Sequence, residues 1–208
     1  MTSEASHSQF QSKTISAVEN LWNHILLIEK RCSDLVMAHS ILTANELDQI
    51  FESDRASAAL GLYESNVIDK STIDAMLDDI LATQEHQRLF ASEEVWSSFV
   101  MIQRFFGRFV LLNKWSLEKK EHMRWRSDAL LRSICEGVIS KDASSDIMSS
   151  EFQALSFVIG ELKSRFLQAA VHAMQSPGSR ETVHAHLEGD IEDIQEQRRS
   201  LGFQLDEV

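Results

Sequence analysis

Glycine and proline are scarce in this chain of 208 residues, which contains seven glycines and a single proline, Pro177. A β-sandwich or β-barrel needs a turn about every 8–12 residues, and tight turns depend heavily on these two residue types. The composition therefore argues against an all-β fold. Leu, Ala, Glu, Gln, Arg and Met, which lose little side-chain freedom in a helix, are abundant, so we expect long helices joined by short polar connections.

Cysteine is equally scarce, and Cys32 and Cys135 are too far apart in the sequence to form a local metal or redox motif. Both lie in apolar helical patterns, so we expect buried free thiols, which favours a reducing cytoplasm. The sequence also lacks a glycine-rich phosphate loop, a His-Glu-x-x-His motif and a Gly-x-Ser-x-Gly motif. These absences argue against nucleotide hydrolysis, zinc proteolysis and α/β-hydrolase chemistry. We expect neither a metal nor a cofactor.

No apolar run has the length and lack of charge of a membrane span, which needs ~20 mostly apolar residues. The nearest candidate, residues 95–112, is interrupted by Arg104 and Arg108. Residues 1–9 also lack the basic and apolar regions of a secretory signal. We therefore expect a cytoplasmic protein with no membrane attachment and one deeply buried helix.

Apolar residues recur with the helical period along most of the chain. Ile15 begins a strong amphipathic pattern, and Thr43 and Glu46 have the spacing of a capping box. Ser92 precedes a helix that runs to about residue 117 and is apolar nearly all round, which suits the middle of a bundle. Further helices are expected over 71–81 and from Asp128 to about 139. After a polar loop over 140–150, a long helix that includes 165–174 is expected to stop at Ser176 and Pro177. We predict an all-α bundle of about seven to nine helices around the central helix 92–117.

The domain organisation is predicted from polarity and from the helix-stopping Pro177. We expect a flexible polar tail over 1–9, a bundle domain over 10–177, and a C-terminal helix and tail over 178–208. The last helix has a narrow apolar stripe, which suits docking along one seam. It packs either against its own bundle or against another subunit. The stripe, our candidate partner contact, consists of Val183, Leu187, Ile191, Ile194 and Leu201.

Charge is unevenly distributed in this chain, whose formal net charge is −12. Residues 104–132 contain eight basic and three acidic residues, with aromatic residues between them. Such a composition suits an anion or a nucleic acid, because cations bind phosphate and aromatic rings stack on bases. Alternatively, these cations pair with acids of the same chain or of a partner, since charges within about 8–10 Å interact at cellular salt. The candidate ligand-binding residues are Arg104, Arg108, Lys114, Lys119, Lys120, Arg124, Arg126, Trp115 and Trp125.

The stretch RFLQAAVHAM, residues 165–174, places Arg165 and His172 on nearly the same face of a helix. This spacing resembles the signature of the HEPN ribonucleases, all-α proteins of toxin and phage-defence systems. The resemblance implies metal-independent RNA cleavage across a dimer, with Arg165 contacting phosphate and His172 transferring a proton. A histidine near its unperturbed pKa can act as acid or base at neutral pH. The alternative is a solvated polar stripe that also includes Gln168 and Gln175.

The absence of catalytic motifs, the uneven charge and the narrow C-terminal stripe together favour a non-enzymatic function. We predict an interaction or accessory subunit that presents helical surfaces to a protein partner or to its own copies. The first alternative is a HEPN-like ribonuclease. The second is nucleic-acid or anion binding through residues 104–132.

Overall fold

The computed structural model describes residues 2–53, 86–139, 147, 149–150 and 152–174. Over these residues the secondary structure is helical with no strand, which confirms the all-α class. The elements are α1 (Thr2–Ile41), α2 (Ala44–Glu52), α6 (Glu93–Lys119), the 3-10 helix η1 (Trp125–Ser127), α7 (Ala129–Val138) and α9 (Ala154–Met174). These six elements do not match the expected seven to nine. The helices expected over 71–81 and after Pro177 lie outside the described residues.

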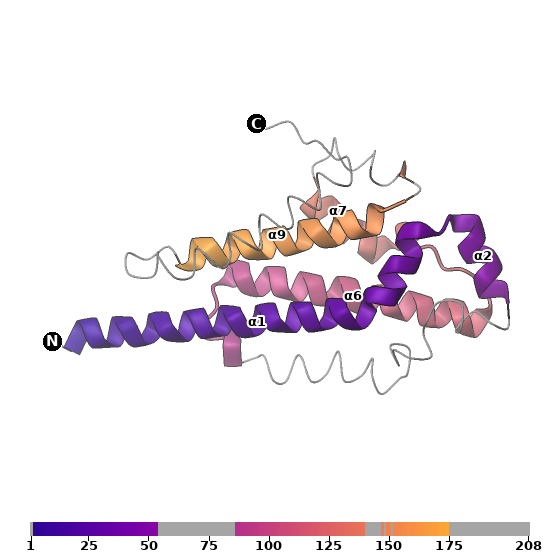
Figure 1. Cartoon of the computed structure of the whole chain (residues 1–208). Helices are drawn as coiled ribbons and strands as arrows, with labels where there is room; N and C mark the ends of the chain where they lie inside the picture. The colour runs from indigo at the N-terminus through magenta and orange to yellow at the C-terminus, as the bar shows by residue number, and fades with distance from the viewer. Residues whose placement is uncertain (1, 54–85, 140–146, 148, 151, 175–208) are drawn as a thin grey trace.

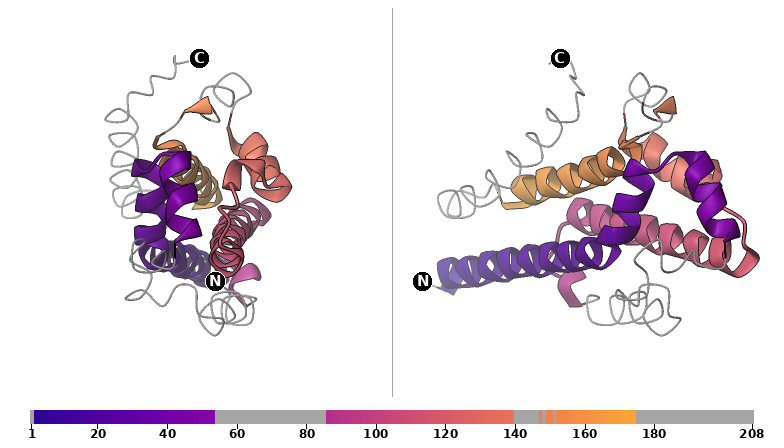
Figure 2. Two further views of the ribbon diagram at one scale, coloured as in Figure 1. Left: turned by 90° about the vertical axis from the view of Figure 1, so that its right-hand side faces the viewer. Right: turned by 45° about the vertical axis from the view of Figure 1, so that its right-hand side comes forward.

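Three long helices, α1, α6 and α9, form the body of the molecule (Figure 1). Figures 1 and 2 show α1 and α6 running in the same direction and α9 running in the opposite one. Two contacts fix the antiparallel register of α1 and α9: Ser40 bonds Ser156 at 2.8 Å, and Lys163 bonds Glu29 at 2.8 Å. The short helix α2 packs at the end of the bundle where α1 stops, while α7 packs against α6 and α9.

The central helix predicted over 92–117 is α6. Ser92 caps its N-terminus by accepting a hydrogen bond from the Val95 N–H, and the helix ends at Lys119, two residues beyond the predicted end. Four phenylalanines of α6 are at most 1 % exposed, so they fill the space between the long helices. Truncating a phenylalanine of this kind to alanine costs about 3–5 kcal/mol. They are Phe99, Phe105, Phe106 and Phe109.

By length and composition, α6 is also the one described helix that is apolar enough to cross a membrane, with a mean hydropathy of 1.2. However, 61 % of its most apolar window is buried inside the structure. The core helix of a globular bundle has the same properties, because it must be apolar on every side.

Helix ends confirm several predictions from local sequence. The Thr43 hydroxyl accepts from the Glu46 N–H while the Glu46 carboxylate accepts from the Thr43 N–H, so the predicted capping box is present. Asp128 caps α7. The first helix is longer than expected, because α1 is continuous from Thr2 and includes residues 2–9, where we predicted a flexible tail. Cys32 and Cys135 are buried free thiols, as predicted.

The chain reverses at the end of α6 through a C-terminal cap. Lys120 has a left-handed backbone with φ 52°, and the Glu121 N–H donates to the Ser116 carbonyl at 3.1 Å, the pattern of a Schellman motif. The Met123 N–H then donates to the Ser116 hydroxyl at 2.8 Å. These bonds hold residues 121–127 against the end of α6, next to α2.

Candidate functional sites

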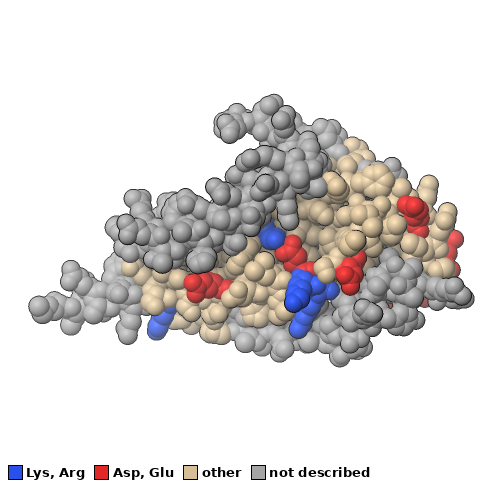
Figure 3. All heavy atoms as spheres, in the orientation of Figure 1, with Lys and Arg blue, Asp and Glu red and all other residues tan. Residues whose placement is uncertain are grey.

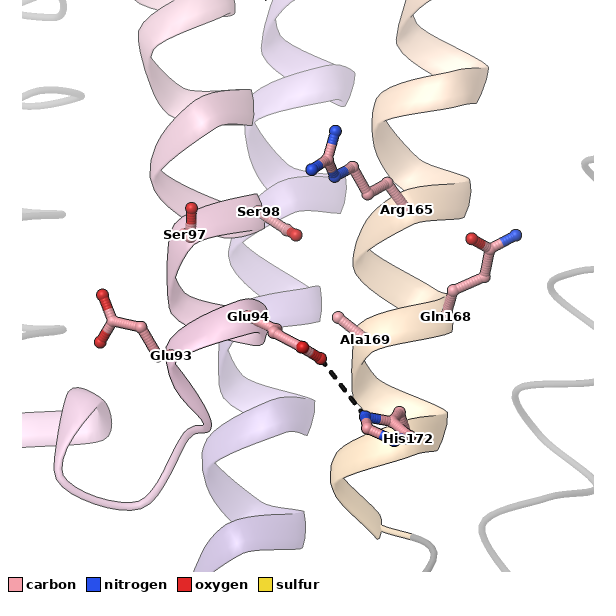
Figure 4. Close-up of a pocket in the computed structure, with 8 residues that line it drawn as sticks. All are labelled: Glu93, Glu94, Ser97, Ser98, Arg165, Gln168, Ala169 and His172. Atoms are coloured by element: carbon pink, nitrogen blue, oxygen red, sulfur yellow. Dashed lines mark hydrogen bonds and ion pairs between the residues drawn. The ribbon is translucent and has the colours of Figure 1, made fainter. Parts of the chain in front are cut away.

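Arg165 and His172 both line a surface hollow of about 460 Å³ between α6 and α9 (Figure 4). Each side chain has a separate contact: Arg165 donates to the Gly137 carbonyl, and His172 Nδ1 lies 3.3 Å from Glu94 Oε2. Figure 4 shows that the two side chains do not point toward one another. Within one copy of the chain they share a hollow but do not act on a common point.

The hollow has a mixed electrostatic character. Its other charged residues are Glu93 and Glu94, whose carboxylates repel a phosphate group. The His172–Glu94 pair is a weak surface interaction, because the two side chains are 74 % and 67 % exposed. Arg165, Gln168 and His172 are all exposed on α9, so they also form the solvated polar stripe that was the alternative interpretation.

Arg108, from the predicted basic span, is engaged within the chain. Its Nε and Nη2 both donate to Asp128 Oδ2, at 3.0 and 2.6 Å, and its guanidinium lies 5.0 Å from the centre of the Trp115 ring. The hydrogen bonds from Arg108, supported by the backbone N–H groups of α7, hold the pKa of Asp128 below its usual value. Arg108 therefore joins α6 to the N-cap of α7, and Trp115 of the same helix lies against its guanidinium.

Other cations of the basic span also contact groups of the same chain. Arg124 pairs with Asp48 at 2.8 Å, and Arg132 donates to the Arg126 carbonyl at 3.2 Å. Trp125 is buried and does not present its ring to solvent for stacking on bases. Lys114 lies 3.9 Å from Glu118. Exposure does not separate these residues, since Arg124 and Arg132 are exposed like Arg104, Lys119 and Lys120.

Figure 3 shows cationic and acidic side chains interspersed over one face of the molecule. On that face the described residues do not form a large patch of one sign. Internal pairing, which was one of the two predictions for the basic span, thus holds for Arg108, Lys114 and Arg124. A broad nucleic-acid surface has less support than the composition suggested.

A second cleft, of about 240 Å³, lies between the end of α1, the start of α2 and the segment 122–127. Its apolar wall includes Leu42, Leu47 and Trp125. Its ionisable lining residues are all of the basic type: His39, His122, Arg124 and Arg126.

His39 on α1 is buried and neutral at pH 7. Because Asn113 Nδ2 donates to the Phe109 carbonyl at 2.8 Å, Asn113 Oδ1 is left to accept from His39 Nε2–H, also at 2.8 Å. Burial lowers the pKa of His39 to about 4, although the bond to Asn113 opposes this shift. The nearby His122 and Arg126 lower the pKa further, which indicates a positive potential in the cleft.

His122, whose side chain is buried, pairs with the half-buried Asp48 of α2. Its side chain is 4 % exposed, it stacks on Phe51, and its Nδ1 lies 2.8 Å from Asp48 Oδ1. Because an ionised carboxylate only accepts hydrogen bonds, Nδ1 carries the proton and Nε2 carries the lone pair of the neutral ring. Nε2 makes no hydrogen bond, although the nearby Ala44 backbone favours the protonated ring.

The pKa shifts of this pair have opposing causes. Burial lowers the pKa of His122, and the bond to Asp48 only partly offsets this. Desolvation raises the pKa of Asp48, but the hydrogen bonds from His122 and Arg124 outweigh it, so the net shift is downward. An oriented imidazole with an unoccupied second nitrogen can donate or accept a proton. Sequence reasoning did not predict this pair, because the two residues are 74 positions apart.

Three large apolar side chains are exposed at the junction of α1 and α9. Met37 and Ile41 lie one turn apart on α1 and are 61 % and 57 % exposed, while Phe152 is 43 % exposed. The Gln153 N–H donates to the Ser40 carbonyl at 3.2 Å, which brings the backbone at Phe152 beside the end of α1. We call these three residues the junction surface.

Two further predictions concern metals and the C-terminal stripe. In the part of the chain that the structure describes, no group of three or more His, Cys, Asp or Glu could hold a metal ion. The stripe lies outside the described residues, as does Gln175. The stripe residues are Val183, Leu187, Ile191, Ile194 and Leu201.

No protein-family model, no curated protein and no solved structure matches this chain. Its function must therefore be inferred from its own residues.

Proposed function

We propose that this chain is a non-enzymatic interaction or accessory subunit that binds a protein partner through the junction surface. The exposure of Met37, Ile41 and Phe152 carries this proposal. Exposed apolar side chains that lie together often mark a protein-binding surface, whereas single ones are normal. The C-terminal stripe predicted from the sequence is a second contact in this proposal.

The backbone next to Phe152 supports the same surface. Gln153 has φ 61°, in the left-handed region that costs a residue with a side chain about 1–2 kcal/mol. Strain of this kind is found where a side chain must be held in a particular position for function. Here it lies beside an exposed aromatic ring that would be more stable if buried.

The expected partner is a different protein with an apolar contact surface and basic residues around it. The net charge of −12 makes two copies of this chain repel each other and attracts a basic surface. The two buried thiols, which form no disulfide, support a reducing compartment such as the cytoplasm.

The junction surface is tested by comparing three tagged chains as baits: wild type, Ile41→Glu and Leu89→Glu. Leu89 is a matched control, because it is 75 % exposed and lies next to Phe90, at the Lys13 end of the bundle. A central apolar contact contributes about 2 kcal/mol or more, so Ile41→Glu is expected to weaken binding at least ~30-fold. Leu89→Glu is expected to bind like wild type.

The proposal fails if the two substitutions affect the captured partner equally. It loses most of its support if size-exclusion chromatography with light scattering shows a monodisperse monomer that captures no partner. A stable dimer that Ile41→Glu dissociates would replace the foreign partner with a second copy of the chain.

A metal-independent ribonuclease is a second proposal, supported by the position of Arg165 and His172 in one hollow. It requires a dimer that brings copies of these residues together. Growth arrest on expression, and RNA cleavage in the presence of a chelator, should both disappear in a folded His172→Ala variant. Cleavage that persists in this variant would rule out the role of His172.

A further inference from the structure

The cleft between α1, α2 and residues 122–127 has a charge that is unusual for this chain. Its ionisable lining residues are two arginines and two histidines, in a protein of net charge −12. The Asp48 carboxylate bonds His122 and Arg124 but does not line the cleft. Asp48 therefore positions two of the basic groups without making the cleft itself acidic.

Several hydrogen-bond donors remain available at this cleft. A guanidinium has five N–H groups, and the contact of Arg124 with Asp48 is made through Nη2 at 2.8 Å. The Arg124 side chain is 54 % exposed, so its remaining N–H groups are accessible. The His122 side chain is more than nine-tenths buried in the cleft wall, and its Nε2, which makes no hydrogen bond and carries the lone pair of the neutral ring, becomes a further donor only when the ring is protonated.

We propose that this cleft binds a small organic anion whose carboxylate or phosphate oxygens face Arg124 and Arg126 and whose apolar part packs against Leu42 and Leu47. Guanidinium groups suit such oxyanions because their planar donors match the geometry of the acceptor oxygens. The volume of about 240 Å³ is below the range of ~300–1,000 Å³ typical of pockets for drug-sized ligands. A compact ligand is therefore the best match.

His122 links ligand binding to protonation in this proposal. The bound anion adds a negative charge near an imidazole that otherwise faces Asp48, His39, Arg124 and Arg126. A negative charge favours the protonated ring, so anion binding should raise the pKa of His122.

The test uses the full chain with benzoate and phenyl phosphate as probes and with chloride at equal ionic strength as a control. Calorimetry measures binding, and NMR follows the imidazole signals of the histidines. We expect saturable binding of at least one probe and an upward shift of the His122 pKa. Benzoate and phenyl phosphate distinguish a carboxylate site from a phosphate site.

Three variants locate the site. Arg126→Gln and Arg124→Gln should each weaken binding about tenfold or more, which corresponds to 1.4 kcal/mol. Arg165→Gln is the matched control, because it removes an exposed arginine from the other hollow and should leave binding unchanged. Two cleft variants are used because Arg124→Gln also removes the ion pair with Asp48.

Specific results would overturn the proposal. These are the absence of saturable binding, equal weakening by Arg165→Gln, or an unchanged His122 pKa in the bound state. Binding of an oligonucleotide, without either small probe, would instead assign these arginines to a nucleic-acid surface. None of these outcomes depends on the junction surface, so the two proposals are tested independently.

Discussion

His39 provides the sharpest test of the buried polar groups at the end of the bundle. Its imidazole is neutral in the folded protein because burial lowers its pKa to about 4, whereas an unfolded chain restores a value of about 6.5. Below pH 6.5 the unfolded state therefore binds a proton that the folded state excludes. The stability that depends on neutral His39 is fully present above pH 6.5 and is lost as the pH falls toward 4.

The size of the effect follows from the two pKa values. One pKa unit corresponds to 1.36 kcal/mol, so between pH 7 and pH 5 the protonation of His39 in the unfolded state lowers the free energy of unfolding by about 2 kcal/mol. The total loss is about 3 kcal/mol below pH 4. His24 and His122 add losses of the same sign, because their pKa values are also lowered, mainly by burial.

Urea denaturation of wild type and His39→Gln at pH 7 and pH 5 isolates the contribution of His39. Glutamine can still donate to Asn113 but does not titrate, so wild type should lose about 2 kcal/mol more than the variant over this range. His172→Gln, which changes an exposed histidine, should follow wild type. If wild type and His39→Gln lose equal stability, His39 is not held neutral by burial and the reasoning fails.

Three other predictions follow from local geometry. Gln153→Gly should raise the free energy of unfolding by roughly 0.5–1 kcal/mol in urea titrations, because the relief of left-handed strain exceeds the cost of glycine's added freedom in the unfolded chain. A lower free energy of unfolding would show that the Gln153 side chain contributes more stability than the strain removes. Asp128→Ala should lower the melting temperature more than Asp128→Asn, because alanine loses both the α7 cap and the Arg108 contact whereas asparagine can still cap the helix. Equal decreases in melting temperature would show that the cap does not stabilise the fold. Burial raises the pKa of Cys32 to about 12 and that of Cys135 to about 11. A thiol reagent at pH 8 should therefore label the folded protein at least ~100-fold more slowly than the urea-unfolded protein. Comparable labelling rates would contradict the burial of both thiols.

Much of the fold was predictable because it depends on local patterns. Apolar spacing and capping residues located α6, α7 and α9 to within a few residues, and Thr43 and Glu46 formed the predicted capping box. The start of α1 was not predicted, because polar residues at 2–9 are compatible with helix and extend α1 to Thr2. Polar residues indicate exposure to solvent more reliably than they indicate where a helix ends.

The site residues were harder to predict because they meet only in the folded chain. Arg124, Arg126 and Trp125 were identified from composition, but their neighbours His39 and Asp48 come from helices far away in the sequence. Nothing in the sequence around Asp48 distinguishes it from other acidic surface residues. A signal was available only for His122, which lies among the cations of the basic span.

The antiparallel contact of α1 with α9 also has a consequence for synthesis. Ser40 and Ser156, which bond where the two helices meet, are 116 residues apart, a distance that a ribosome covers in roughly 6–25 s. Until then Trp22 of α1 lacks the Phe166 ring on which it stacks at 5.7 Å. Because α1 is synthesised well before α9, its apolar face stays uncovered in the interval, and nascent chains halted before α9 should be clients of chaperones that hold apolar helices.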